Sequence, residues 1–143
     1  MRVLFDTNVV LDLLLEREPF VDAAASLFAR AERGQLSGYV CATTITTIHY
    51  LAAKVVGAEP AREAISTLLS IVEVAPVNRA VTEAALESPL SDFEDAVLLE
   101  AARSCGVQSI VTRNASDFVP GDLPIFEPTE LLAVLRVEED GEG

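Results

Sequence analysis

The chain has 143 residues, half of them hydrophobic, and a formal net charge of −13, which favours one acidic domain with a substantial core and excludes a disordered chain. Charged residues interrupt every apolar run before it reaches the length of a membrane span, and Met1 leads directly into strand-like residues without a signal peptide, so we expect a cytoplasmic protein without a membrane partner. Two cysteines and one histidine cannot build a structural zinc site of the usual kind, and the overall acidity excludes nucleic-acid binding through a generally basic surface.

Strand-like and helical patterns alternate along the chain. In chain order we predict a strand at 2–5, helices at 8–15 and 19–33, a strand at 38–42, helices at 43–57 and 59–71, a strand at 72–77, helices at 78–88 and 91–106, strands at 108–114 and 123–128, and a helix at 128–136. This alternation predicts an α/β fold, a single domain over residues 1–136 with a central parallel sheet of four to five strands flanked by helices. Residues 137–143 form an acidic tail that we expect to be frayed.

The first strand ends in polar residues, in the stretch VLFDTNVVLDLL. Asp6, Thr7 and Asn8 follow the apolar strand without a glycine or proline to form an ordinary turn. Open parallel sheets bind ligands at the carboxyl ends of their strands. Asp6 therefore stands where chemistry is expected, although an aspartate there could also serve as the N-cap of the following helix.

A second group of acids lies in PLSDFEDAVLLEAA. Ser91 and Glu94 have the spacing of a capping box, so Glu94 has a structural explanation and is discounted as a ligand. Asp95 shares a helical face with leucine and alanine side chains, and a carboxylate on a core-facing stripe is costly unless charge or hydrogen bonds compensate it. Asp92 lies one turn earlier and could act with Asp95 or belong to the cap.

A third polar group follows the strand in SIVTRNASDF. Thr112, Arg113 and Asn114 end the strand, and Asp117 comes three residues later. An Asx-type turn would explain the same residues. Arg113 could bind a phosphate or pair with the neighbouring acids.

These groups converge if the first and fourth strands are neighbours, because Asp6, Asp95 and Asp117 then meet in one crevice. Carboxylates that meet repel one another and have raised pKa values unless a cation joins them. A hard divalent cation, Mg²⁺ or Mn²⁺, is the natural cofactor for such an oxygen-rich site. Side chains that would orient the carboxylates or bound waters are Thr7, Asn8, Thr112 and Asn114.

Three stretches resemble the motifs of a known family. LFDTNVVLDLL is similar to the first motif of PIN-domain ribonucleases, DFEDAVLLEAA to the third and IVTRNASDF to the fourth. Their order and spacing extend over residues 1 to about 135, and the resemblance is closest to small prokaryotic members, many of which are similar to the toxins of VapBC toxin–antitoxin pairs. The resemblance implies the sheet order 3-2-1-4-5.

The same resemblance implies an endoribonuclease in which an activated water on Mg²⁺ or Mn²⁺ attacks an RNA phosphodiester. The acids that match the family's metal site are Asp6, Asp95 and Asp117, with Asp92 as a further catalytic acid. Thr112 and Asn114 match the polar residues of the fourth motif. The partners implied are an RNA substrate, a cognate antitoxin and, because the family is often dimeric, a second copy of the chain.

One position departs from the family. A glutamate usually stands near the start of the helix after the second strand, and the best match here is Thr47 in CATTITTIHYL. A hydroxyl cannot replace the charge of a carboxylate. Either Asp92 compensates in part, or metal binding is weaker, or activity is reduced or lost, which keeps open a PIN-like module that binds RNA or a protein without cutting.

Other readings of the chain fit less well. A phosphatase of the haloacid-dehalogenase type needs a second aspartate at the place of Asn8, and a receiver domain needs a lysine late in the chain, where the only lysine is Lys54. His49 could be a general base, but a surface or partner-facing role ranks above it because nothing fixes its geometry.

Overall fold

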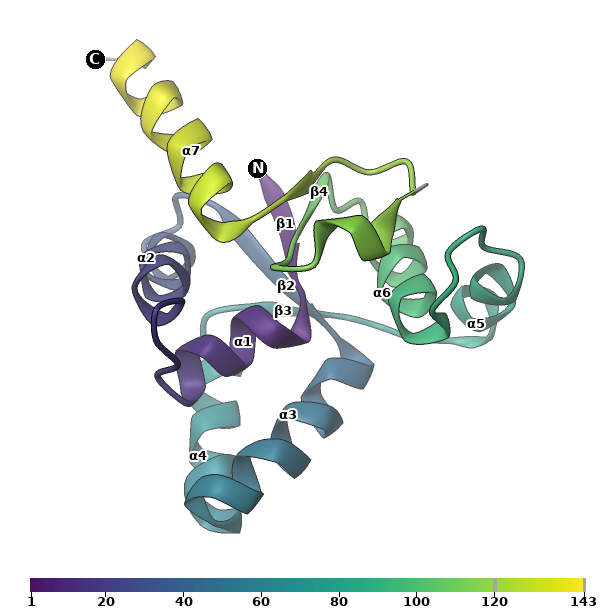
Figure 1. Cartoon of the computed structure of the whole chain (residues 1–143), viewed down its shortest axis with the longest axis horizontal. Helices are drawn as coiled ribbons and strands as arrows, with labels where there is room; N and C mark the ends of the chain where they lie inside the picture. The colour runs from purple at the N-terminus through teal and green to yellow at the C-terminus, as the bar shows by residue number, and fades with distance from the viewer. Residues whose placement is uncertain (120, 143) are drawn as a thin grey trace.

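The structure is a computed structural model that describes residues 1–119 and 121–142. Figure 1 shows the chain from its amino-terminal strand at the centre to a long carboxyl-terminal helix that projects from the body. The elements are β1 (Arg2–Phe5), α1 (Thr7–Leu14), α2 (Val21–Glu32), β2 (Ser37–Cys41), α3 (Ala42–Val56), α4 (Ala58–Leu69), β3 (Glu73–Ala75), α5 (Arg79–Leu86), α6 (Phe93–Ser104), β4 (Ser109–Val111), the 3₁₀ helix η1 (Ala115–Phe118), β5 (Ile125–Phe126) and α7 (Pro128–Glu142).

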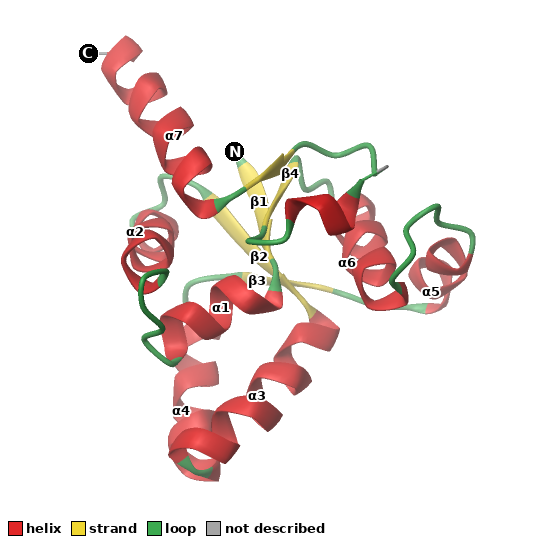
Figure 2. Cartoon of the chain, viewed as in Figure 1, coloured by secondary structure: helices red, strands yellow, loops and turns green. Residues whose placement is uncertain are grey.

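The five strands form one parallel sheet in the order β3-β2-β1-β4-β5. Strand β1 lies at its centre, where Val3 aligns with Gly38 of β2 on one side and with Ser109 of β4 on the other. Figure 2 shows these strands surrounded by helices. The predicted fold class and strand order are therefore confirmed, and β1 and β4 are neighbours.

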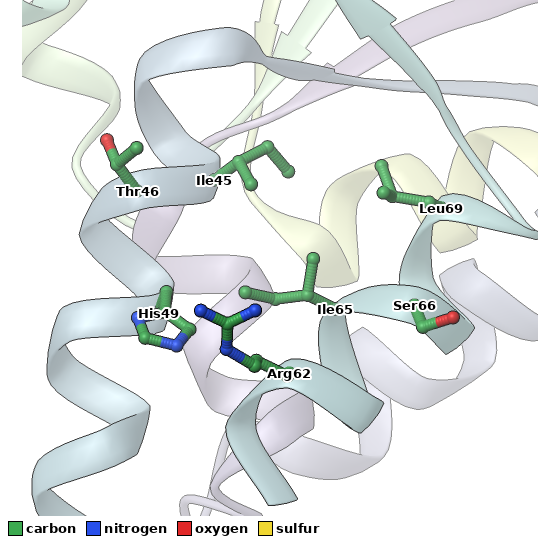
Figure 3. A pocket seen from close by; sticks show the side chains of 7 residues that line it. All are labelled: Ile45, Thr46, His49, Arg62, Ile65, Ser66 and Leu69. Atoms are coloured by element: carbon green, nitrogen blue, oxygen red, sulfur yellow. The ribbon is translucent and has the colours of Figure 1, made fainter. Parts of the chain in front are cut away.

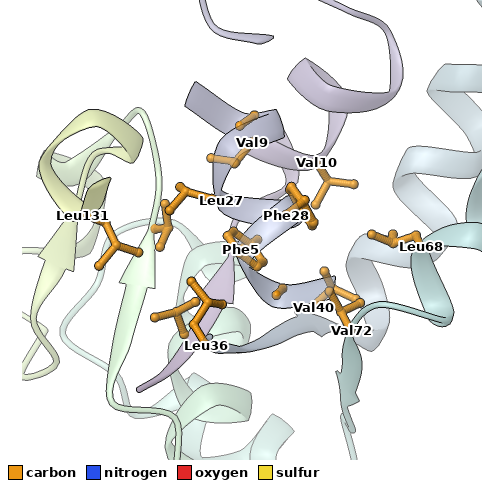
Figure 4. Close-up of a cluster of buried hydrophobic side chains, with 14 of the residues drawn as sticks. Phe5, Val9, Val10, Leu27, Phe28, Leu36, Val40, Leu68, Val72 and Leu131 are labelled. Atoms are coloured by element: carbon orange, nitrogen blue, oxygen red, sulfur yellow. The ribbon is translucent and has the colours of Figure 1, made fainter. Parts of the chain in front are cut away.

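Alternation along β1 divides the core into two halves. Val3 and Phe5 face one layer, with side chains from α1, α2, α3, α4 and α7, whereas Leu4 faces the other layer, with side chains from α5 and α6. Figure 4 shows the first cluster, in which the ring of Phe5 stacks on that of Phe28 with centroids 4.3 Å apart. A central strand buried on both faces explains why its residues are apolar without a polar alternation.

Gly38 of β2 permits this packing. A Cβ atom at this position would stand 2.8 Å from a ring carbon of Phe5 and 3.1 Å from a methyl carbon of Val72. The absent side chain therefore leaves the space that the Phe5 ring occupies next to β1.

Two helix ends differ from the sequence predictions. Helix α6 is capped by Asp92, whose carboxylate accepts a hydrogen bond of 3.0 Å from the Asp95 amide, so the predicted capping box of Ser91 and Glu94 is wrong. Helix α7 continues through residues 137–142, where we expected a frayed tail.

An ion pair accounts for part of that extension, because Glu139 of α7 pairs with Arg30 of α2, and this contact lowers the pKa of the Glu139 carboxyl. The domain limit at residue 136 stays a prediction. Within residues 1–119 and 121–142, no helix combines the length and the apolar character needed to cross a bilayer.

Candidate active site at the carboxyl ends of β1 and β4

The site lies where the chain changes direction across the sheet. Strands β2 and β3 extend the sheet on one side of β1, and β4 and β5 extend it on the other. The amide of Asp6 donates a 2.9 Å hydrogen bond to the carbonyl of Val111, which ties the carboxyl ends of β1 and β4 together. Such a switch point is the usual place for a ligand in an open parallel sheet.

Asp6 is held rigidly at this point. One carboxylate oxygen accepts a 2.7 Å hydrogen bond from the Thr7 amide and the other accepts a 2.8 Å hydrogen bond from the Thr112 hydroxyl. Asp6 is thus the N-cap of α1, which was the second role that the sequence allowed for it. It also lines the cavity described below. Burial raises the pKa of the Asp6 carboxyl, the hydrogen bonds from Thr112 and Thr7 oppose that rise, and the charges of Asp117 and Asp92 add to it.

Asn8 joins the polar residues that follow the two strands. Its amide nitrogen lies 3.4 Å from both the carboxylate of Asp6 and the hydroxyl of Thr112. Its side-chain oxygen accepts a 3.4 Å hydrogen bond from the Arg113 amide. The Thr112 hydroxyl also accepts a 3.0 Å hydrogen bond from the Asn114 amide, so the predicted polar residues of both strand ends form one network.

Asp95 approaches this network from the first turn of α6. The pKa of the Asp95 carboxyl is raised to about 7, chiefly by burial and then by the charges of Asp92, Asp6, Asp117 and Glu94, in that order of importance. Asp95 is half-buried, between the exposed residues 91–94 and the buried residues 96–99, so its carboxylate is only partly hydrated. The five acids thus lie close enough to raise the pKa of Asp95, and the sequence analysis predicted such a meeting for three of them, Asp6, Asp95 and Asp117.

One cavity of ≈ 320 Å³ collects most of the predicted residues. It is lined by Asp6, Thr7, Asn8, Leu11, Arg17, Thr47, Glu94, Asp95, Leu98, Arg113 and Asn114. Glu94 is among them, although the sequence gave it only a capping role. Asp92 and Asp117 do not line this cavity, and their charges act on Asp95 from its surroundings.

Thr47 occupies the place where the resemblance leads us to expect a glutamate. It lines the same cavity, but its hydroxyl donates a 3.1 Å hydrogen bond to the Thr43 carbonyl of its own helix. One turn earlier, Thr44 is buried and its hydroxyl lies 3.0 Å from that of Thr7. Helix α3 therefore contributes hydroxyl groups to this part of the site and no carboxylate.

The donor set fits a hard divalent cation in its chemistry. The side chains are carboxylates, amides and hydroxyls, which Mg²⁺ and Mn²⁺ prefer, and a cation would relieve the repulsion that raises the pKa of Asp6 and Asp95. Among the described residues, no three acidic, histidine or cysteine side chains stand close enough to hold one ion. Mg²⁺ needs no such cage, because it commonly binds through one or two carboxylates and retains several waters.

Asp12 is a buried acid that sequence reasoning missed. Its side chain is 1% exposed and pairs with two arginines, Arg17 at 2.9 Å and Arg113 at 2.7 Å. Arg113 therefore pairs with an acid, as one of its two predicted roles required, but that acid is Asp12 and not a member of the expected metal site. An aspartate within the apolar run VVLDLLL was the signal that could have found this pair.

His49 lies at a different cavity. A cavity of ≈ 480 Å³ is lined by residues of both α3 and α4, and Figure 3 shows His49 and Arg62 pointing toward each other in it. The His49 Nε2 atom is buried and has no hydrogen-bond partner in the described part of the chain. Its place in a cavity other than that of Asp6 and Asp95 argues against a role as general base there.

Comparison with known proteins gives both a sequence match and structural matches. The family model for the PIN domain matches residues 2–116 of the chain. A chain of the VapBC2 complex of Rickettsia felis, solved bound to a promoter DNA fragment, is 15% identical with a TM-score of 0.68, covering 89% of this chain and 98% of that chain.

Two further solved structures are equally similar in fold. The VapC20 toxin of Mycobacterium tuberculosis, described as cleaving the sarcin–ricin loop, is 18% identical with a TM-score of 0.68, covering 85% of this chain and 96% of that chain. A chain of a toxin–antitoxin complex of Klebsiella pneumoniae is 21% identical with a TM-score of 0.68, covering 88% and 97%. No curated protein sequence matches the chain. At these identities, the structural matches establish the fold.

Proposed function

The chain belongs to the PIN-domain family, and we propose that it is a metal-dependent endoribonuclease that acts as the toxin of a toxin–antitoxin pair. The observation that carries the proposal is the cavity at the ends of β1 and β4, where Asp6 and Asp95 both have raised pKa values. Carboxylates brought together against their own repulsion are typical of a site that binds a cation.

Asp6 and Asp95 would hold Mg²⁺ or Mn²⁺ as the principal ligands, and Asp117, the third predicted ligand, would contribute its charge from outside the cavity. When bound, the ion would neutralise the carboxylates, lower the pKa of a bound water and polarise a phosphodiester. Asp92 would add negative charge beside Asp95 in the way that the resemblance implies, while its carboxylate also caps α6.

The rest of the network positions these carboxylates. Thr7 and Thr112 hold one oxygen of Asp6 each, so the carboxylate needs little reorganisation to act as a ligand. Asn8 connects Asp6 to Thr112 and to the Arg113 backbone, and Asn114 fixes the turn that follows β4. Such supporting hydrogen bonds orient metal ligands and tune their basicity.

RNA is the substrate that the fold matches support. One of the structural neighbours is described as a toxin that cleaves the sarcin–ricin loop, and others are toxin–antitoxin complexes. A protein with a net charge of −13 suits a basic antitoxin segment as its partner. The predicted homodimer and the cytoplasmic location stay predictions.

A second candidate function is a PIN-like module that binds RNA or a protein without cleaving. Two observations favour it: Thr47 stands in the place of the expected glutamate, and the described residues contain no cluster of three metal-ligating side chains. The two candidates differ in whether the acid cavity supports hydrolysis.

Cleavage of a mixed pool of RNA distinguishes them. The purified chain, Asp6→Asn and the control Asp22→Asn, which alters an exposed first-turn acid of α2, are incubated with RNA and Mn²⁺, with Mg²⁺ or with a chelator. We expect cleavage by the parent and the control in the presence of metal only, and none by Asp6→Asn. A substrate with 2′-O-methyl groups should also be cut, because an attacking water does not use the 2′-hydroxyl.

Equal cleavage by Asp6→Asn, or cleavage that survives chelation, contradicts the proposed site. No cleavage by any of the proteins, combined with retained RNA binding, supports the non-catalytic module.

A further inference from the structure

Two arginines share one buried carboxylate beside the acid cavity. The Nε atom of Arg17 lies 2.9 Å from one oxygen of Asp12, and the Nε and Nη2 atoms of Arg113 lie 2.7 and 3.2 Å from its two oxygens. A carboxylate that is 1% exposed must be paired to remain charged. Two cations on one anion leave a surplus positive charge, in a chain whose net charge is −13.

Both guanidinium groups are fixed in orientation. Arg17 also donates a 3.2 Å hydrogen bond to the Asn8 carbonyl, and the guanidinium of Arg113 lies 3.8 Å from the ring centroid of Phe20. The two side chains remain 40% and 27% exposed and line the cavity that holds Asp6 and Asp95. Each therefore offers hydrogen-bond donors to that cavity at a small further cost in side-chain entropy.

Stability alone does not account for this arrangement. Arginines that served only to neutralise the acid cavity would pair with its carboxylates, but in the described part of the chain both pair with Asp12 instead. Asp12 thus holds two cations beside the acids and leaves those acids free. The ligand that satisfies guanidinium donors next to a carboxylate site is a phosphate group, which accepts paired hydrogen bonds from arginine.

We infer that Arg17 and Arg113 form a phosphodiester-binding pair at the mouth of the acid cavity and that buried Asp12 positions them. The inference rests on the proposed function and adds how an acidic protein can hold an RNA backbone. Arg113 also borders a cavity of ≈ 450 Å³ lined by Pro19, Phe20 and Pro128.

The test uses a fluorescently labelled single-stranded RNA of mixed sequence. Its dissociation constant is measured in chelator over a series of salt concentrations, for the parent chain, Arg17→Gln and Arg113→Gln. The matched control is Arg79→Gln, which removes an exposed arginine that pairs with Glu83 on α5. We expect Arg17→Gln and Arg113→Gln each to weaken RNA binding roughly tenfold. Each should also reduce the slope of log K against log salt concentration by about 0.7, which is the contribution of one phosphate contact with a single strand.

Two further measurements separate a binding role from a structural one. In Mn²⁺, both glutamine variants should raise KM with a smaller change in kcat, while calorimetric Mn²⁺ affinity stays at the parent value. Arg113→Lys retains the charge but not the planar group, so it should retain the salt dependence and recover part of the affinity. Asp12→Asn should raise KM as both arginine variants do, and the arginine variants carry the test if it fails to fold.

Parent values of the RNA dissociation constant, salt dependence and KM in both glutamine variants, with cleavage intact, overturn the inference and leave the proposed function standing. A lower melting temperature with unchanged KM shows a purely structural cluster and overturns it as well. If both glutamine variants lose Mn²⁺ affinity by the same factor as RNA affinity, the substitutions act on the acids of the cavity, and this result also contradicts the inference. A parent chain that neither binds nor cleaves RNA contradicts both proposals.

Discussion

Asp95→Asn should stabilise the metal-free protein above neutral pH. The pKa of the Asp95 carboxyl rises from its ordinary value of 3.8 to about 7, chiefly through burial and the charges of Asp92 and Asp6. A rise of that size corresponds to about 4 kcal/mol, at 1.36 kcal/mol for each pH unit. Because the carboxylate is partly exposed, solvent screens much of this energy, and we expect a gain of about 1–2 kcal/mol on substitution.

The sign of the pH dependence follows from proton linkage. The folded protein holds the Asp95 proton more tightly than the unfolded chain, so the ionised carboxylate destabilises the fold. That destabilisation is absent below about pH 4, grows between pH 4 and 7 and is constant above 7. The stability difference between Asp95→Asn and the parent should follow the same course.

Urea unfolding in chelator measures this difference. Near pH 8 the gain corresponds to an increase in melting temperature of roughly 3–6 °C for a chain of this size. Asp22→Asn, an exposed first-turn aspartate of α2, should show no comparable gain. A variant no more stable than the parent near pH 8, or an equal gain near pH 4, would refute the electrostatic account of the acid cavity.

Three further substitutions test other parts of the account. Asp12→Asn should lower the free energy of unfolding by about 3–5 kcal/mol, because it leaves Arg17 and Arg113 without their buried anion. The surface control Arg79→Gln should change it little, and a loss for Asp12→Asn within 0.5 kcal/mol of that control would contradict the prediction. Gly38→Ala should cost about 1–3 kcal/mol in urea unfolding, because its Cβ would stand 2.8 Å from the Phe5 ring, and a neutral result would show that the ring can move aside. Thr47→Glu should tighten Mn²⁺ binding roughly tenfold in calorimetry by adding a carboxylate to the cavity, and an unchanged affinity would remove Thr47 from the site.

The main features of the sheet could be predicted from short apolar runs that end in polar residues. Asp6 was found in this way, because an acid at the carboxyl end of a buried strand has a known place in a parallel sheet. Asp95 was found because it interrupts an apolar helical face. Both residues were predicted from local pattern, and the structure places both in the same cavity.

The remaining features depend on information that is not local. Ser91 and Asp92 are adjacent residues that both suit an N-cap, and only the final backbone geometry selects Asp92. Asp12 and Arg113 are 101 residues apart in the chain, so no sequence spacing indicates their ion pair. Glu94 had a plausible capping partner in the sequence, and its place in the cavity follows from the true start of α6.

Calorimetric titration of Mn²⁺ into the parent chain, Asp6→Asn and Asp22→Asn near pH 8, where Asp95 is ionised, tests the central claim most directly. The account predicts binding to the parent and to Asp22→Asn, with loss of that binding in Asp6→Asn. An absence of binding to the parent at millimolar Mn²⁺, or the same affinity in Asp6→Asn as in the parent, would contradict a metal site at the carboxyl ends of β1 and β4.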